Sequence, residues 1–144
     1  PDESVRERLR CEAGRYDVGL GNVFGTAALR AAYTGGDEWL DQLNGYIQDN
    51  ITFVADYIER NRPEIKVYRT EGTYMIWLDC RSMGMNPQEL LDFFAQKAGV
   101  AISEGSMFGE QGPGFVRLVL AIPREVLKRA MDQIYEAYLT VKSG

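Results

Sequence analysis

An apolar stripe between residues 37 and 62 limits the possible folds more than any other pattern in the chain. Its members recur at steps of three and four residues: Leu40, Leu43, Ile47, Ile51, Val54 and Ile58. This spacing is that of one face of an α-helix. Asp37 can cap the helix, and Arg62-Pro63 ends it because the residue before a proline avoids the α region. A helix of this length either connects two parts of a protein or serves as an ordinary core helix, and the spacing favours neither.

Two shorter helices are predicted before this stripe. Residues 2–13 are strongly charged and carry apolar side chains at helical spacing. Asn22 can cap a second helix, which the pair Gly35-Gly36 ends. This second helix is rich in alanine. Its small side chains would therefore let another backbone approach closely.

After Pro63 the chain changes from helical to mixed patterns. Strands are predicted over residues 65–68, 73–78, 100–102 and 115–122. One helix is predicted from its cap at Asn86 to a stop at Gly99, and another from Pro123 onward. This order of elements predicts an α+β fold. We expect a small mixed or antiparallel sheet covered by helices, with the long helix of residues 37–61 on its N-terminal side.

The composition argues against several kinds of site. The chain has no histidine, which removes the commonest general base and metal ligand. Cys11 and Cys80 lie outside any CxxC spacing, so neither a zinc site nor a disulfide framework is supported. A net charge of -5 argues against nucleic acid and against a basic membrane helix. No apolar run approaches the ~20 residues that cross a bilayer. We therefore expect a cytoplasmic domain without nucleic-acid or membrane partners.

Arg117 is the strongest candidate for a functional side chain. It lies in an apolar run in which side chains alternate between two faces, so Phe115 and Val119 share its face. An arginine among apolar neighbours on a central strand is costly unless it has a partner. Its guanidinium suits a carboxylate, which it can bind through two parallel hydrogen bonds. The residues leave two interpretations open: a ligand carboxylate, or a structural role at the surface or beside an acid such as Asp79.

The segment 103–114 before this strand is rich in glycine. Glycine-rich loops cradle phosphate where they open into the N-terminus of a helix, but this segment runs into a strand. The pattern therefore favours a flexible connection between two strands. Loops of this kind can close over a ligand.

Three motifs occur in a familiar order: Glu71–Asp79, Gly105–Gly109 and Gly114–Leu118. Together they resemble the C-terminal region of the class I/II aminotransferases, specifically the branch that contains the MalY/PatB-type cystathionine β-lyases. Asn22–Gly25 and Glu38–Leu40 resemble the same branch, so the similarity extends over nearly the whole chain. Each motif alone is weak, but three at the right spacing and in the right order are specific.

The resemblance implies a fold-type-I pyridoxal-phosphate (PLP) enzyme that acts on an amino-acid substrate. Such enzymes are usually homodimers, with a large cofactor domain and a smaller C-terminal domain. Residues 1–36 would then be the tail end of the large domain, and residues 37–144 the connecting helix and the small domain. The resemblance also implies that Arg117 binds the α-carboxylate of the substrate, with Ser106 and Phe108 near the substrate entrance.

The same resemblance implies that part of the active site is missing. The family's Schiff-base lysine, the aspartate that faces the pyridine nitrogen and the phosphate-binding residues all lie upstream of the matching region. The lysines of this chain lack the family's lysine context: Lys66, Lys97, Lys128 and Lys142. No catalytic residue is therefore assigned. We expect an inactive fragment without its N-terminal PLP domain, and PLP only in the intact enzyme.

Two reactions stay open within this family. Elimination at a C–S bond is slightly favoured by the branch, and transamination is the other. A function of a different class is a freestanding α+β ligand-binding or regulatory module that uses Arg117 as an anion anchor without a cofactor. A purely structural packing or dimer unit is a third.

Overall fold

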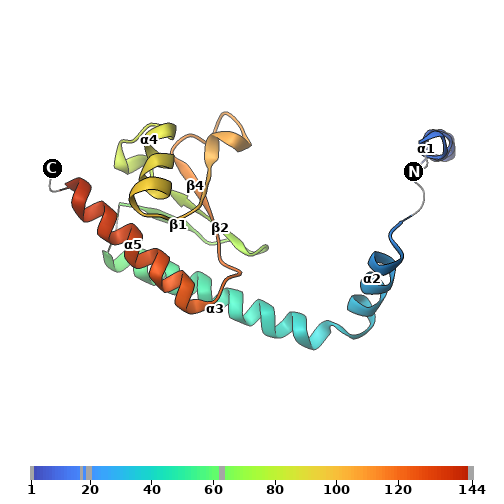
Figure 1. The fold of residues 1–144 in the computed structure, drawn as a ribbon, viewed down its shortest axis with the longest axis horizontal. Helices are drawn as coiled ribbons and strands as arrows, with labels where there is room; N and C mark the ends of the chain where they lie inside the picture. Colours follow the sequence, from blue (N-terminus) through green and yellow to red (C-terminus); the bar gives the residue numbers. More distant parts are fainter. Residues whose placement is uncertain (1, 17, 19–20, 62–63, 143–144) are drawn as a thin grey trace. The chain divides into compact units, whose positions relative to one another are not determined.

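The computed structural model describes residues 2–16, 18, 21–61 and 64–142. The chain divides into two compact units, Pro1–Gln42 and Leu43–Gly144. Figure 1 labels α1 to α5 and the strands β1, β2 and β4. The helix α3, Asp37–Asn61, begins in the first unit and continues into the second. The helix begins at the expected cap residue, Asp37, and includes the whole apolar stripe, while the stop expected at Arg62-Pro63 lies outside the described residues.

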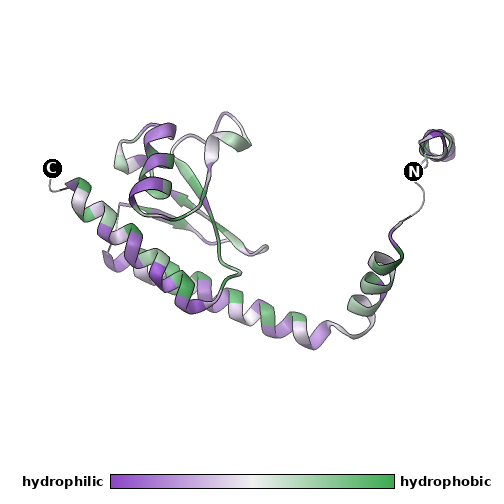
Figure 2. Ribbon diagram, viewed as in Figure 1, coloured by the Kyte–Doolittle hydropathy of each residue, from purple (hydrophilic) through white to green (hydrophobic). Residues whose placement is uncertain are grey.

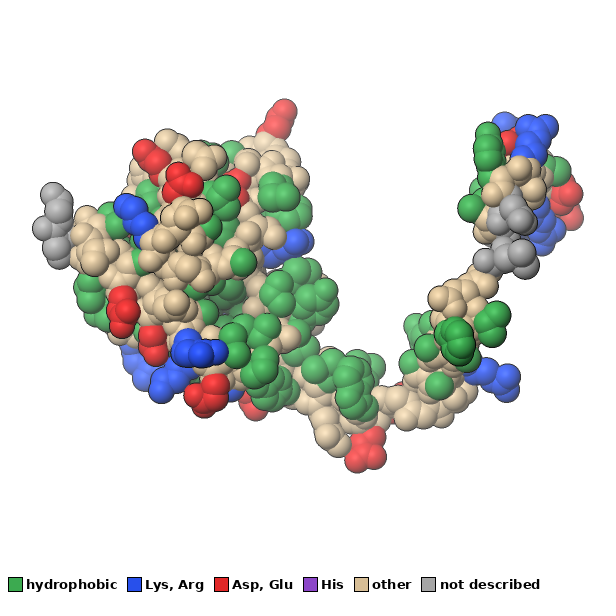
Figure 3. All heavy atoms as spheres, viewed as in Figure 1, with side chains coloured by type: hydrophobic (Ala, Val, Ile, Leu, Met, Phe, Trp, Pro, Cys, Tyr) green, Lys and Arg blue, Asp and Glu red, His purple; other side chains and the backbone are tan. Residues whose placement is uncertain are grey.

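Two helices precede α3 in the first unit: α1, Glu3–Arg15, and α2, Val23–Gly35. Asp2 caps α1 by accepting from the Ser4 backbone N–H at 2.8 Å. Asn22 caps α2 in the same way, with the Phe24 N–H at 2.9 Å. No described residue of either helix is buried. The apolar side chains of α2 are therefore open to solvent, and the space-filling view shows them at the surface (Figure 3). The hydropathy colouring shows that much of this helix is hydrophobic (Figure 2).

The second unit contains a four-stranded sheet in the order β1-β2-β4-β3, with every neighbouring pair antiparallel. Its strands are short: β1 Lys66–Tyr68, β2 Met75–Asp79, β3 Ser103–Glu104 and β4 Phe115–Val119. The expected α+β fold is confirmed, and the sheet is antiparallel throughout. The expectation that Arg117 lies on a central strand is also confirmed, since β4 has a neighbour on each side.

Two of the strand predictions have wrong boundaries. A strand was expected over residues 100–102, but β3 is Ser103–Glu104. The Val100 N–H donates to the Phe94 carbonyl at 2.8 Å, which ties this segment to the preceding helical turn instead of to β4. The last strand was expected to reach residue 122 but ends at Val119. Beyond it, the Asn50 side chain donates to the carbonyls of residues 120 and 122 at 2.8 and 3.1 Å.

Helices complete the second unit. α4, Pro87–Asp92, begins with a capping box between Asn86 and Glu89 and continues as the π-helical turn η2, Phe93–Lys97. α5 spans Arg124–Lys142. Two short 3-10 turns are η1, Arg81–Met83, and η3, Gly105–Phe108.

The core lies between one face of the sheet and these helices. Side chains alternate along β2 and β4, so Ile76, Leu78, Val116 and Leu118 are at most 4% exposed. They share one apolar cluster with buried residues of α3, α4, η2 and α5. The opposite face of the sheet carries Arg117 and is only partly covered. One face of the sheet is therefore packed in the core, and the other face is accessible to a ligand.

Candidate functional site

The partly covered face presents one row of side chains across all four strands. Tyr68 is paired with Trp77, Trp77 with Arg117, and Arg117 with Ser103. Directly paired residues point to the same face, with Cβ atoms roughly 5 Å apart. The sheet register therefore places Trp77 and Ser103 on either side of Arg117.

Arg117 is half-buried, and its polar contacts are incomplete. Its Nη2 donates to the Ser103 Oγ at 3.4 Å, which is long for a hydrogen bond. Its Nε is buried and has no hydrogen-bond partner. The guanidinium carbon lies 4.4 Å from the centroid of the Phe108 ring, so the ring supports the cation from one side. Within the described part of the chain, no carboxylate lies within ion-pair distance of Arg117.

Asp79 is not the partner of Arg117. Its carboxylate accepts from the Nε and Nη2 of Arg81 at 2.9 and 2.8 Å. The hydrogen bond from the Arg81 side chain keeps the pKa of Asp79 below its usual value. The structural alternative of an Arg117–Asp79 pair is therefore wrong, and Arg117 keeps its positive charge available.

The glycine-rich segment joins β3 to β4, as the sequence predicts, and it forms the short turn η3. Glu104 caps this turn: its Oε2 accepts from the Ser106 N–H at 2.9 Å and from the Ser106 hydroxyl. Gly105 and Gly112 cross so closely that a Cβ on either would overlap the carbonyl of the other. These contacts hold Phe108 against Arg117. Ser106, by contrast, turns its hydroxyl toward Glu104.

A hollow of about 470 Å³ opens beside Phe108, and we call it the aromatic hollow. It is lined by Tyr68, Trp77, Phe108, Gln111, Gly112 and Phe115. Trp77 contacts Phe108 edge-to-face, with ring centroids 5.4 Å apart at 89°. It also contacts Phe115, at 6.5 Å and 84°. Phe108 therefore belongs both to the hollow and to the surroundings of Arg117.

The sequence predicts only part of this arrangement. Alternation along residues 115–122 predicts the face of Arg117. The same alternation along residues 73–78 assigns Trp77 to the face opposite Ile76 and Leu78, but it does not predict that Trp77 lies beside Arg117. Ser103 and Glu104 carried no such signal, because their roles depend on the register and on a turn.

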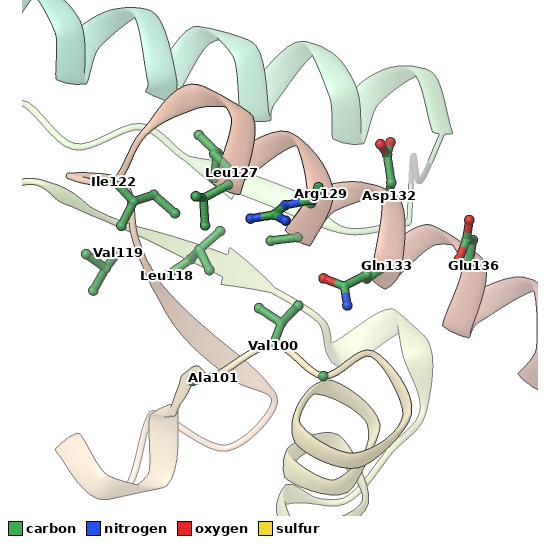
Figure 4. Close-up of a pocket in the computed structure, with 13 residues that line it drawn as sticks. Val100, Ala101, Leu118, Val119, Ile122, Leu127, Arg129, Asp132, Gln133 and Glu136 are labelled. Atoms are coloured by element: carbon green, nitrogen blue, oxygen red, sulfur yellow. The ribbon is translucent and has the colours of Figure 1, made fainter.

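A second hollow, of about 600 Å³, lies where the expected strand at residues 100–102 is missing (Figure 4). Leu118 and Leu127 line it, and Gln133 extends from α5 toward Val100. Its charged residues have mixed signs: Arg129, Asp132 and Glu136. Arg117 lines neither hollow, but Phe108, whose ring contacts the Arg117 guanidinium, lines only the aromatic hollow. We therefore place the candidate site on the other face of the sheet.

The described residues do not fit a cofactor bound through a lysine beside Arg117. All four lysines are exposed, and none lines the aromatic hollow. In the described ranges, no group of three His, Cys, Asp or Glu side chains could hold a metal ion. None of the helices in these ranges combines the length and apolar content needed to cross a bilayer. What the site does provide is the guanidinium of Arg117 beside a group of aromatic rings.

Comparison with known proteins relates the chain to part of several longer enzymes. No family model matches the chain. It is 34% identical over 129 residues to the protein MalY of Escherichia coli, which is 90% of this chain and 33% of that protein. It is 32% identical over 137 residues to the cystathionine β-lyase PatB of Bacillus subtilis, which is 95% of this chain and 35% of that protein. The chain is homologous to a portion of the MalY/PatB-type enzymes.

Solved structures of this family agree with the fold. A PLP-bound putative aminotransferase from Clostridium difficile matches 95% of this chain and 35% of its own, with a TM-score of 0.91 and 37% identity. Cystalysin from Treponema denticola, which contains PLP, matches 97% of this chain and 36% of its own, with a TM-score of 0.88 and 31% identity. The helices and the antiparallel sheet of this chain thus match the corresponding portions of these aminotransferase-type structures. The chain spans about a third of the length of these relatives.

Proposed function

We propose that this chain provides the carboxylate anchor of a PLP-dependent enzyme that acts on amino acids, with Arg117 as the anchor. The observation that carries this proposal is the state of Arg117. Its guanidinium is half-buried and supported by the Phe108 ring, its Nε has no partner, and no described acid neutralises it. A partly buried guanidinium whose Nε has no partner is costly, and a bound carboxylate would lower that cost.

The roles of Ser106 and Phe108 differ in this proposal. Phe108 contacts the guanidinium and limits its orientation, so it would hold the anchor ready for the carboxylate. Ser106 acts through the loop, because its hydroxyl and N–H both bind the Glu104 carboxylate. Fixing the carboxylate orients the rest of the amino acid, which is a contribution of proximity and orientation.

The cofactor and the lysine that binds it would belong to another part of the intact enzyme. Residues 1–36 would be the tail end of a large PLP domain, and residues 37–144 the connecting helix and small domain. PLP would supply the electron sink for the reaction. The lysine for its Schiff base would come from the N-terminal PLP domain, and the intact enzyme would be a homodimer. The relatives include both cystathionine β-lyases and an aspartate aminotransferase. The intact enzyme would catalyse one of two reactions on its amino-acid substrate, C–S elimination or transamination.

Carboxylate binding to the chain itself tests this proposal. Propionate would be titrated into ¹⁵N-labelled protein while the backbone amide resonances of Ser103 and Phe108, which flank the guanidinium, are followed by NMR. Arg117→Lys removes the two-pronged geometry but keeps the charge, and it should weaken binding by about tenfold or more, since hydrogen bonds to charged groups contribute about 1.5–3 kcal/mol. Arg124→Lys is the matched control, because Arg124 also lies over a ring, that of Phe53, at 4.7 Å.

The two variants separate the outcomes. Weaker binding in Arg117→Lys together with unchanged binding in Arg124→Lys supports the anchor. Equal binding by the wild-type protein and Arg117→Lys would mean that propionate does not use the guanidinium, and the assignment of Arg117 would be wrong.

A further inference from the structure

The aromatic hollow has a composition that differs from an ordinary protein surface. Four of its six lining residues are aromatic, and two of them, Tyr68 and Phe108, are 50% and 48% exposed. The four rings form a continuous row of contacts. Tyr68 contacts Phe115 with ring centroids 6.2 Å apart, Phe115 contacts Trp77, and Trp77 contacts Phe108. The rings are thus held in tilted and edge-to-face contacts, and one side of the cluster stays open. A further ring could join this cluster by the same kinds of contact.

The charges around the hollow differ at its two ends. Arg81 lies over Phe115 at 4.8 Å, but Asp79 neutralises it. Arg117 lies over Phe108 at 4.4 Å and has no acidic partner among the described residues. A cationic ligand would meet a guanidinium at either end, so the aromatic rings do not form a cage for cations. The charge instead favours a ligand whose negative group lies at the Arg117 end.

The dimensions fit a single small molecule that uses both features. Trp77 and Arg117 are direct cross-strand partners. Their Cβ atoms are therefore roughly 5 Å apart. In an aromatic amino acid the ring and the carboxylate are separated by only two carbon atoms. Such a molecule can place its carboxylate at Arg117 and its ring against the exposed side of the Phe108–Trp77 pair.

We propose that the aromatic hollow is the side-chain pocket of this site and that it selects amino acids with aromatic side chains. This inference rests on the proposed role of Arg117 as the carboxylate anchor. It makes Trp77 and Tyr68 specificity-determining residues, although neither would touch the carboxylate. Aliphatic and thioether side chains would fill the same space, but they lack a ring that could contact the cluster edge-to-face.

A matched series of small acids tests this inference with the chain as it is. Trp39 and Trp77 are its two tryptophans. The variant Trp39→Phe therefore makes Trp77 the only tryptophan, and its fluorescence reports on the hollow. The probes are 3-phenylpropionate, propionate, 4-(methylthio)butanoate and 3-phenylpropylamine. We expect 3-phenylpropionate to bind at least about tenfold more tightly than propionate or the thioether acid, which is the ratio that 1.4 kcal/mol produces.

Variants then locate the effect, measured by calorimetry so that the readout does not depend on Trp77. Tyr68→Ala should reduce the preference for the phenyl acid and leave propionate binding unchanged. Tyr74→Ala is the control, because Tyr74 has a similar exposure of 48% and does not line the hollow. Phe115→Leu offers a second variant in case Tyr68→Ala does not fold, because Phe115 also lines the hollow.

Each contrary result has a distinct meaning. If all three acids bind equally and lose affinity in Arg117→Lys, the anchor stands and the aromatic pocket is wrong. Equally tight binding of the thioether acid also overturns the pocket's selectivity. If 3-phenylpropylamine binds as well as the phenyl acid, the hollow is an apolar surface unrelated to the anchor. Absence of binding by the phenyl acid up to about 100 mM would reject the inference as well.

Discussion

Asn50 should stabilise the fold strongly although it belongs to no site. It is fully buried, and its Nδ2 donates to the carbonyls of Leu120 and Ile122 at 2.8 and 3.1 Å. The variant Asn50→Ala loses both bonds and leaves two carbonyls without this donor. Each bond contributes about 1 kcal/mol net, and an unsatisfied buried acceptor costs about 1–3 kcal/mol. We therefore expect the free energy of unfolding to fall by about 2–4 kcal/mol.

Urea unfolding followed by circular dichroism measures this change. With an m-value of about 2 kcal/mol/M, the midpoint should fall by roughly 1–2 M at constant slope. Asn50→Leu fills most of the volume without donating, so it separates the hydrogen bonds from the cavity. Asn44→Ala on the same helix is the control, because Asn44 is exposed. If Asn50→Leu unfolds at the wild-type urea concentration, the two hydrogen bonds do not have the stabilising role assigned to them.

Two further changes follow from the contacts around the site. Gly112→Ala should destabilise the fold by at least about 2 kcal/mol, because the Cβ of the alanine would overlap the Gly105 carbonyl. Gly72→Ala is the control: the space around Gly72 is open, so this change should shift the urea midpoint little. The pKa of Asp79 is lowered mainly by its hydrogen bond from Arg81. The stabilisation from this pair should therefore be complete above the unfolded value of 3.8 and be lost as pH falls through the lower folded pKa. In Arg81→Met this acid-dependent loss should largely disappear, and an unchanged pH profile of thermal unfolding would contradict the assignment.

Local patterns in the sequence predicted the parts of the fold that depend on local physics. The stripe that ends at Ile58 predicts α3, because helix periodicity is a property of neighbouring residues. Alternation around Arg117 predicts its face for the same reason. The prediction of a strand at residues 100–102 was wrong because packing decides whether the Val100 N–H bonds to the Phe94 carbonyl or to β4. Periodicity does not encode that choice.

The arrangement of the site depends on contacts between residues that are far apart in the sequence. Which residues flank Arg117 is decided by the register of β2 and β3 against β4, and no spacing within one strand determines that register. Phe108 entered through a family resemblance and not through a pattern. The structure then showed what the side chain does, because it places the ring over the guanidinium. Glu104 was missed since an acid that caps a turn looks like any surface acid in sequence.

The first two helices have a thermodynamic consequence of their own. α1 and α2 contain 13 residues each, and neither buries a described side chain. Helices of about this length are marginal in water without tertiary support. On warming, their ellipticity should decay gradually before the cooperative melting of the sheet and its covering helices. A partner that covers Phe24 and Tyr33, which are 84% and 83% exposed, would convert this gradual decay into part of the cooperative transition.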